Sequence, residues 1–278
     1  EFQVNTHTAD QQRHPDVAMA ADGRFVITWQ SWKQDSGSWG IYTQRYNADG
    51  TPFGEEFRVD PHGSEQQHPA ISMSPNGDYA IVWQAYSRTH HNQIWGSWAR
   101  RFTWDAPKSD VFTVLDEHHR HEEYAKIALN SQGYLVVLTR SSHYGTNLRL
   151  FTPEDAVSPP IQPTYFSGAY YGHDIALTED GQVILVHSKH NVLGDTQDTV
   201  VLAQVFDVVS GEATSEAFRV NQTTTGHQRF PSVSTYPDGQ FIITWEGNGS
   251  GDGDGIYARR YHADGSPQTS EFRVNSVT

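Results

Sequence analysis

The sequence predicts an all-β fold, a five-bladed β-propeller of four-stranded antiparallel blades whose ring is closed by a terminal strand. A short strand that begins at Asp-Gly or Asn-Gly and ends in tryptophan recurs along the 278 residues. Three further strand-like segments recur with it, and repeats of roughly 40 to 55 residues with four short strands are typical of propeller blades. Glycine, aspartate, threonine and aromatic residues are abundant, and no stretch has the apolar period of a helix, which favours an all-β chain.

The recurring strand is the second strand of each repeat. Its clear copies are residues 22–30, 76–84 and 238–246, and its weaker copies are residues 132–140 and 180–188. Asp-Gly and Asn-Gly supply the positive φ that a tight hairpin requires, so a turn is expected before the strand. Trp29, Trp83 and Trp245 end the clear copies in register and are predicted to lie in the core. Thr139 and His187 stand at this position in the weaker copies, through either decay of a duplicated repeat or a functional role.

The other strands complete the repeat in chain order. The first strand lies at residues 14–19, 68–73 and 230–234, and the third at residues 41–46, 97–102 and 256–261. The fourth strand has the motif Glu-Phe-x-Val-Asn or a variant of it. Its copies lie at residues 1–5, 56–60, 111–114, 163–166, 217–221 and 271–275. The predicted repeats span about residues 1–55, 56–110, 111–160, 161–216 and 217–278 of a single domain. Because blades pack face to face, both faces of the second strand are expected to be buried.

The fourth strand exists in six copies, whereas the other strands exist in five. One terminal copy is therefore expected to close the ring by pairing with a blade from the other end of the chain. The remaining copy is expected to be spare, or to belong with further domains of a longer parent chain. The sequence does not decide which terminal copy closes the ring.

The charge balance excludes some partners. The chain has 19 basic and 33 acidic side chains, a formal net charge of −14. Such a surface repels nucleic acid and anionic membranes, so no nucleic-acid partner is expected. No apolar run reaches the roughly 18 residues of a membrane span, so membrane insertion is not expected. The absence of cysteine is neutral on compartment, since a core of this size needs no disulfides.

The candidate binding residues lie in the loops opposite the regular hairpin turns. Function on a rigid scaffold tends to occupy such irregular loops. The loops between the second and third strands contain aromatic residues suited to stacking on a sugar ring, namely Trp32, Trp39, Tyr86 and Trp95. The first strands begin with polar residues suited to bonding sugar hydroxyls, namely Arg13, His14, Gln67, His68 and Arg229. Alternatively, the rings cover the ends of the blades and the polar side chains bond one another and water.

Two segments suggest metal binding. The glycine–aspartate loop of residues 248–255 offers Asp252 and Asp254, and calcium prefers oxygen ligands on flexible loops. The helix-flanked calcium motif is absent, so a flexible hairpin loop is the alternative. Residues 118–123 are rich in histidine, but their spacing fits no zinc motif, and a solvated loop is the simpler interpretation.

Catalytic motifs give no assignment. The sequence has no nucleophile elbow, Walker loop or dinucleotide fingerprint. A carboxylate pair for glycoside hydrolysis could come from residues near the first strands, namely Asp16, Glu122, Glu123 and Asp174. A lyase-type proton abstraction could use His187 and Arg140 with Tyr170 or Tyr171.

The repeat also resembles a known family. The strings Glu-Phe-x-Val-Asn, Asp-Gly-x-Phe-Val-Ile-Thr-Trp-Gln-Ser and Ile-Tyr-x-Gln-Arg-Tyr-Asn-Ala-Asp-Gly resemble a repeat of large secreted bacterial proteins. Many of these look like calcium-dependent surface adhesins with repeats-in-toxin tails. The resemblance is close in residues 1–60 and 217–278, fair in residues 56–110 and poor in residues 111–216. It implies a secreted or cell-surface setting within a longer chain, and it transfers no functional residue.

These observations lead to three functional hypotheses. The first is a lectin-like module that binds a glycan, with neutral polar sugars favoured, through the aromatic and polar residues of the irregular loops. The second is a polysaccharide-active enzyme, a glycoside hydrolase or lyase, that uses the irregular third and fourth repeats. The third is a structural or protein-binding repeat with no small ligand. No cofactor other than calcium is implied.

Overall fold

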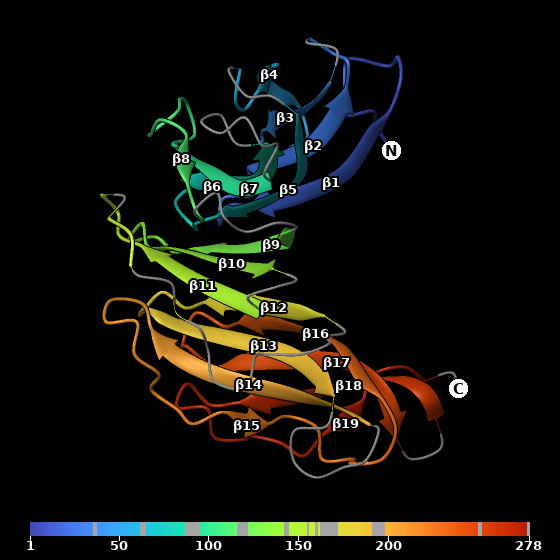
Figure 1. The fold of residues 1–278 in the computed structure, drawn as a ribbon. Coiled ribbons are helices and arrows are strands. Elements are labelled where there is room, and N and C mark those ends of the chain that lie inside the picture. The colour runs from blue at the N-terminus through green and yellow to red at the C-terminus, as the bar shows by residue number, and fades with distance from the viewer. Residues whose placement is uncertain are drawn as a thin grey trace. The chain divides into compact units, whose positions relative to one another are not determined.

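The computed structural model describes residues 1–35, 38–61, 65–86, 95–115, 122–141, 145–154, 156–158, 161, 172–190, 198–249 and 252–276. The chain divides into two compact units, Glu1–Val157 and Ser158–Thr278. Both units consist of antiparallel sheets joined by turns (Figure 1). No helix in the described part of the chain is long and apolar enough to cross a membrane.

The first unit contains three sheets, here called blades 1 to 3, each built from consecutive strands. Blade 1 consists of β1 (Gln12–Met19), β2 (Phe25–Trp32), β3 (Trp39–Tyr46) and β4 (Pro52–Arg58). Blade 2 consists of β5 (Gln66–Met73), β6 (Tyr79–Tyr86), β7 (Trp95–Phe102) and β8 (Phe112–Thr113). Blade 3 consists of β9 (Glu122–Leu129), β10 (Leu135–Ser141) and β11 (Gly145–Phe151). The fourth-strand copy predicted for blade 3, residues 163–166, lies outside the described residues.

The second unit contains blades 4 and 5, each with four strands. Blade 4 consists of β12 (His173–Leu177), β13 (Gln182–His190), β14 (Thr199–Asp207) and β15 (Phe218–Arg219). Blade 5 consists of β16 (Gln228–Thr235), β17 (Phe241–Gly249), β18 (Asp252–Tyr261) and β19 (Phe272–Arg273). The last copy of the fourth strand pairs with β18 of its own repeat and completes blade 5, whereas the copy at residues 1–5 belongs to none of the described sheets. Pairing of a terminal copy with a blade from the other end of the chain stays a prediction. The predicted five sheets and their strand order are confirmed, while the single domain stays a prediction.

The predicted turns are present at the start of every second strand. Gly23, Gly77, Gly133, Gly181 and Gly239 have φ between 82° and 95°, a conformation that glycine adopts without a steric penalty. Each turn is closed by backbone hydrogen bonds, such as that from the Gly23 amide to the Ala20 carbonyl at 3.1 Å. The Asp-Gly and Asn-Gly signals therefore located the hairpins correctly.

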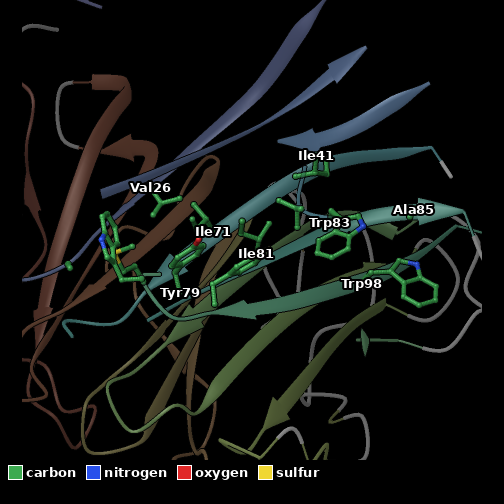
Figure 2. Packing of buried hydrophobic residues seen from close by; sticks show 13 residues of the cluster. Val26, Ile41, Ile71, Tyr79, Ile81, Trp83, Ala85 and Trp98 are labelled. Atoms are coloured by element: carbon green, nitrogen blue, oxygen red, sulfur yellow. The ribbon is translucent and has the colours of Figure 1, made fainter. Parts of the chain in front are cut away.

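The tryptophans in register form the core, as predicted. Trp29, Trp83 and Trp245 are 3%, 0% and 2% exposed. Trp83 lies in one apolar layer with Ile71 and Ile81 of the same blade (Figure 2). In the weaker repeats, His187 and Thr139 fill the same position and are buried as well.

The phenylalanine of the fourth-strand motif packs on the following blade. The Phe57 ring of blade 1 lies 5.9 Å from the Phe102 ring of blade 2, which in turn stacks on Tyr79 at 4.8 Å. The equivalent contacts join Phe112 to Phe151 at 5.2 Å and Phe218 to Tyr261 at 5.4 Å. Blades 1 and 2, blades 2 and 3, and blades 4 and 5 are thus joined by an aromatic contact that the sequence motif encodes.

Glu56 and Glu271, the first residues of two copies of the motif, stabilise the connection that leads into their blade. Glu56 accepts a hydrogen bond from the Thr6 amide at 2.7 Å, and Glu271 accepts one from the Thr223 amide at 3.2 Å. The motif residue Val59 is fully buried, and its amide donates to the Ile41 carbonyl of β3 at 2.8 Å. The motif is therefore explained by packing and backbone pairing.

We expect Phe57→Ala to destabilise the protein by about 2 kcal/mol, because it removes a half-buried ring from the contact between blades 1 and 2. Phe2→Ala is the matched control: Phe2 has the same motif position and lies 5.4 Å from Tyr46, but it is 55% exposed. Its replacement should cost less than about 0.5 kcal/mol. Thermal and urea unfolding measure both values, and equal losses would contradict this assignment.

Candidate functional site

The candidate site begins with an aromatic pair at one end of blade 1, here called the platform. Trp32 ends β2 and lies directly opposite Trp39, the first residue of β3. Their ring centroids are 5.2 Å apart, and both side chains are half-buried. Since the two indoles share a β-hairpin, their positions are set by backbone pairing.

Two cations flank the platform. The guanidinium carbon of Arg13 lies 6.0 Å from the Trp39 ring, and the Lys33 ammonium lies 5.5 Å from the Trp32 ring. Both cations are exposed, and no ion pair with either is found among the described residues. The structure therefore brings together three predicted residues, Trp32, Trp39 and Arg13, and adds Lys33.

Lys33 is the residue that sequence reasoning missed on the platform. It follows Trp32 directly in the sequence, and this adjacency was the available signal. Its backbone has φ of 60°, so the chain turns immediately after β2. That turn places the side chain over the preceding ring, which adjacency alone does not predict.

Blade 2 has an aromatic pair at the equivalent position. Tyr86 lies opposite Trp95 in the β6–β7 register, as Trp32 lies opposite Trp39. Trp95 is half-buried, whereas the side chain of Tyr86 and the loop of residues 87–94 lie outside the described part. Stacking by Tyr86 and Trp95 stays a prediction.

A strained bulge recurs in the first strands of blades 1, 2 and 5. The register shifts at His14, His68 and Phe230, and these residues have φ of 52°, 54° and 51°. Each precedes a proline. Such a conformation costs a non-glycine residue about 1–3 kcal/mol and is often found at functional sites. Bulges of this kind redirect a side chain out of the regular pleat.

The bulges of blades 1 and 2 bring two predicted residues together. The rings of His14 and His68 lie 4.7 Å apart, edge to face. The His68 amide donates to the side-chain oxygen of Gln30 in β2 at 2.8 Å, which fixes the bulge of blade 2 to blade 1. Burial, and secondly the neighbouring His14, lower the pKa of His68. The neighbouring Gln67 donates to Glu65 at 2.6 Å.

Arg229, the predicted residue in blade 5, lies in an ion pair. It donates to Glu246 on the facing strand at 2.9 Å, and Asp254 is 3.8 Å away. A guanidinium beside Asp254 competes with any cation for that carboxylate. The side chain of Asp252 is not described, and the described residues contain no group of three or more candidate metal ligands. Calcium binding at Asp252 and Asp254 stays a prediction.

Two of the carboxylates considered for catalysis have structural partners. Asp16 accepts the Ile71 amide of blade 2 at 2.9 Å, and Asp174 accepts the Val233 amide of blade 5 at 3.1 Å. Both therefore tie neighbouring first strands together. His187 is fully buried. The side chains of Glu122, Glu123 and Arg140, and all of Tyr170 and Tyr171, lie outside the description.

The irregular fourth repeat nevertheless has titratable groups that sequence reasoning missed. β13 ends in Lys189 and His190, both half-buried. Burial lowers the pKa of Lys189. The His190 ring lies 6.4 Å from that of His227, edge to face. His190 occupies the position of Trp32 in its repeat, which was the available signal.

The fold is shared with carbohydrate-active enzymes. An α-L-arabinanase of Penicillium chrysogenum, solved with arabinobiose, matches with a TM-score of 0.58 and 10% identity over 97% of this chain and 82% of that one. An ulvan lyase bound to -[GlcA(1-4)Rha3S]- matches with a TM-score of 0.51 and 13% identity over 94% and 72%. A Hadza microbial sialidase matches with a TM-score of 0.50 and 12% identity over 92% and 57%.

These likenesses identify the fold as a five-bladed propeller and do not transfer residues, because the identities are so low. No family model matches this sequence. No curated protein matches it either. The resemblance to secreted adhesin repeats therefore stays a prediction.

We expect the protein to lose stability as the pH falls below about 6.5, the usual pKa of histidine. The pKa of His68 is lower in the folded state than this value, so the unfolded state binds more protons in this range. His68→Gln should flatten the dependence of the melting temperature on pH between about 6.5 and 5.5. An unchanged slope in this variant would contradict the assignment.

Proposed function

We propose that this chain is a polysaccharide-active enzyme, a glycoside hydrolase or lyase, whose glycan lies against the platform of Trp32 and Trp39. The observation that supports a glycan is the half-buried indole pair with an exposed cation over each ring. An indole offers a flat apolar face to the C–H face of a sugar. The flanking Arg13 and Lys33 are donors only, so they suit the oxygen atoms of the sugar.

The charge of the platform favours an acidic glycan over a neutral one. The protein as a whole has a formal charge of −14, yet the groups beside the indoles are cationic. The two cations attract carboxylate or sulfate groups despite the negative net charge of the protein. Dissolved salt screens each charge beyond about 10 Å at 0.1 M, so the distant acidic groups have little effect at the platform. Uronic acid or sulfated sugars are thus the preferred class.

An enzyme is preferred because the solved structures that share this fold include an arabinanase, a sialidase and an ulvan lyase. The third and fourth repeats depart from the regular pattern and offer candidate acid and base groups. In blade 3, Glu123 lies opposite Arg140 in the strand register. Both residues belong to the same unit as the platform.

A lectin-like module without catalysis is the second candidate. It is favoured by the structural roles of Asp16 and Asp174, whose carboxylates bind backbone amides of the next blade. It is also favoured by the complete burial of His187. For either function, we propose a secreted or cell-surface setting within a longer chain, as the resemblance to bacterial adhesin repeats implies.

We expect Trp39→Ala to weaken glycan binding about tenfold, the effect of losing about 1.4 kcal/mol of stacking. A glycan array with acidic and neutral polysaccharides, followed by calorimetry on the best ligand, measures this change. Tyr236→Ala is the control, because Tyr236 is an exposed aromatic residue of the second unit. Binding that survives in Trp39→Ala would place the glycan elsewhere, and preference for neutral sugars would contradict the acidic class.

We expect turnover of the best ligand, detected as new reducing ends or as the ultraviolet absorbance of unsaturated uronate. Glu123→Gln should lower the rate at least tenfold while leaving the affinity within about twofold, because a general acid or base contributes roughly 100-fold or more. Binding without any product, in the wild-type protein, would decide for the lectin-like module.

A further inference from the structure

A pocket lies between blades 1 and 2, at the opposite end of β3 from the platform. It has a volume of about 150 Å³ and is lined by Arg45, Phe57, Tyr79, Arg100, Phe102 and Asp105, among others. Trp39 begins β3 and Arg45 is its penultimate residue. Six residues of extended strand span about 20 Å, so the pocket and the platform are separate sites.

Arg45 provides a buried donor without an acceptor. Its guanidinium lies over the rings of Phe53 and Phe57, at 5.1 and 5.5 Å, and Nη1 donates to the Trp104 carbonyl at 2.5 Å. Its Nε is buried, and it has no hydrogen-bond partner among the described residues. Because a buried unpaired donor is costly, an acceptor from a bound molecule or water is expected there.

A second guanidinium lines the pocket. Arg100 donates from Nη1 to the Val59 carbonyl at 2.8 Å and from Nε to the Ser109 carbonyl at 3.1 Å. These contacts fix the orientation of its planar group. Both acceptors are carbonyls, and no carboxylate pairs with Arg100 among the residues that the structure describes. A guanidinium held in this way is well suited to an anion.

Only blade 2 has a tyrosine at the position of Tyr79 in the repeat. The residues at the same strand position in blades 1 and 5 are Phe25 and Phe241, which stack on Tyr46 and Tyr261 as Tyr79 stacks on Phe102. A phenylalanine therefore satisfies the packing at this position. Burial raises the pKa of Tyr79, so its hydroxyl stays protonated and can donate at neutral pH.

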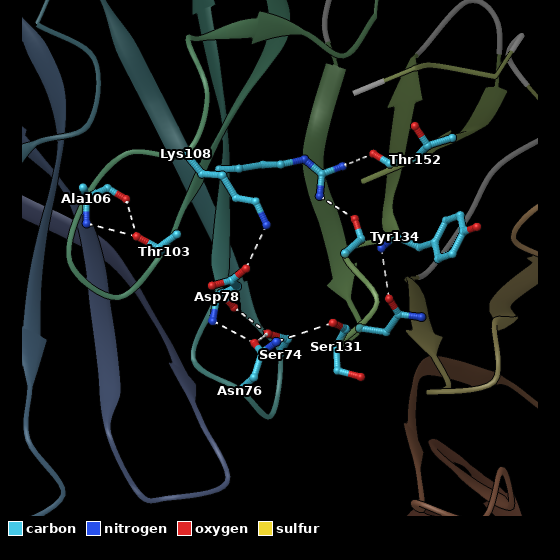
Figure 3. A network of polar contacts seen from close by, with 12 residues as sticks. Ser74, Asn76, Asp78, Thr103, Ala106, Lys108, Ser131, Tyr134 and Thr152 are labelled. Atoms are coloured by element: carbon cyan, nitrogen blue, oxygen red, sulfur yellow. Dashed lines mark hydrogen bonds and ion pairs between the residues drawn. The ribbon is translucent and has the colours of Figure 1, made fainter. Parts of the chain in front are cut away.

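The remaining wall is a short loop after β7 that holds its own shape. The Thr103 hydroxyl lies 3.1 Å from the Ala106 carbonyl, to which it donates, and 3.3 Å from the Ala106 amide (Figure 3). The Thr103 amide donates to the same carbonyl at 2.9 Å. Beyond this loop, Lys108 pairs with Asp78 at 2.9 Å. The exposed Asp105 adds one negative charge to the two positive charges of Arg45 and Arg100.

From this arrangement we infer that the pocket binds a small carboxylic acid with a flat or ring-shaped body. Arg45, Arg100 and the Tyr79 hydroxyl supply donors for the carboxylate, and Phe57 and Phe102 supply apolar walls. The balance of two cations and one anion leaves about one positive charge, which matches a monoanion better than a phosphate dianion. A cavity of about 150 Å³ accepts a molecule near the size of benzene. The carboxylate could therefore belong to an aromatic acid or to a sugar acid.

Calorimetry with benzoate, glucuronate and inorganic phosphate tests this inference on the whole protein. We expect at least one carboxylate to bind with a Kd below about 10 mM, and Tyr79→Phe to weaken it about tenfold, since it removes a hydrogen bond to a charged group. Tyr79→Phe is expected to fold, because Phe25 and Phe241 occupy the equivalent places. Arg260→Gln, at the position of Arg45 in blade 5, is the control and should leave binding unchanged.

The outcomes distinguish the sources and the sites. Benzoate binding identifies an aromatic acid, and glucuronate binding that persists in Trp39→Ala identifies a sugar acid held away from the platform. The inference would be overturned if neither carboxylate bound, if Tyr79→Phe left binding unchanged, or if phosphate bound more tightly. It would also be overturned if benzoate did not bind and Trp39→Ala abolished the binding of glucuronate. None of these results depends on whether the protein degrades a polysaccharide.

Discussion

The contact between the phenylalanine of the fourth strand and an aromatic ring of the next blade, seen within each of the two units, underlies the described structure. A four-stranded sheet of this size cannot bury both of its faces alone. Phe57 on Phe102 and Phe218 on Tyr261 supply the cover from the preceding blade. The stacked pairs Tyr79–Phe102 and Phe241–Tyr261, with interplanar angles of 5° and 7°, give these rings a flat surface to meet. The main role of the Glu-Phe-x-Val-Asn motif is thus to pack one blade against the next.

The same stacking places the candidate sites. Once blades 1 and 2 are held face to face, Asp16 of β1 and Gln30 of β2 lie close enough to accept backbone amides from the first strand of blade 2. These bonds support the strained bulges at His14 and His68, because neighbouring structure must hold a residue in a left-handed conformation. At the other end of the blades, the packing of Phe57 and Phe102 leaves the pocket beside Arg45 and Arg100. The two ends differ in chemistry because one consists of loops with indoles and the other of short turns.

The comparisons change the balance between the functional hypotheses. The residues alone favoured a lectin-like module, because aromatic and polar side chains gather in the irregular loops and no catalytic motif is present. The shared fold with an arabinanase, a sialidase and an ulvan lyase gives more support to an enzyme on polysaccharide. The cations over the rings of Trp32 and Trp39 are the reason why we propose an acidic glycan, where the sequence favoured a neutral one.

The strand order, the hairpins and the buried tryptophans could all be predicted from the amino-acid sequence, because a repeat of fixed period presents each local signal several times. Asp-Gly turns and alternating apolar residues act over a few neighbours, so reading them needs no knowledge of distant contacts. The candidate site was predictable only in part: Trp32, Trp39 and Arg13 were recognised as residues, but their grouping with Lys33 was not. Only the tertiary structure decided that Asp16 and Asp174 serve neighbouring backbones, that Arg229 faces Asp254, and that Arg45 and Arg100 share a pocket. Those pairings join residues 25 to 59 positions apart or lie across facing blades, where sequence spacing contains no information about which side chains meet.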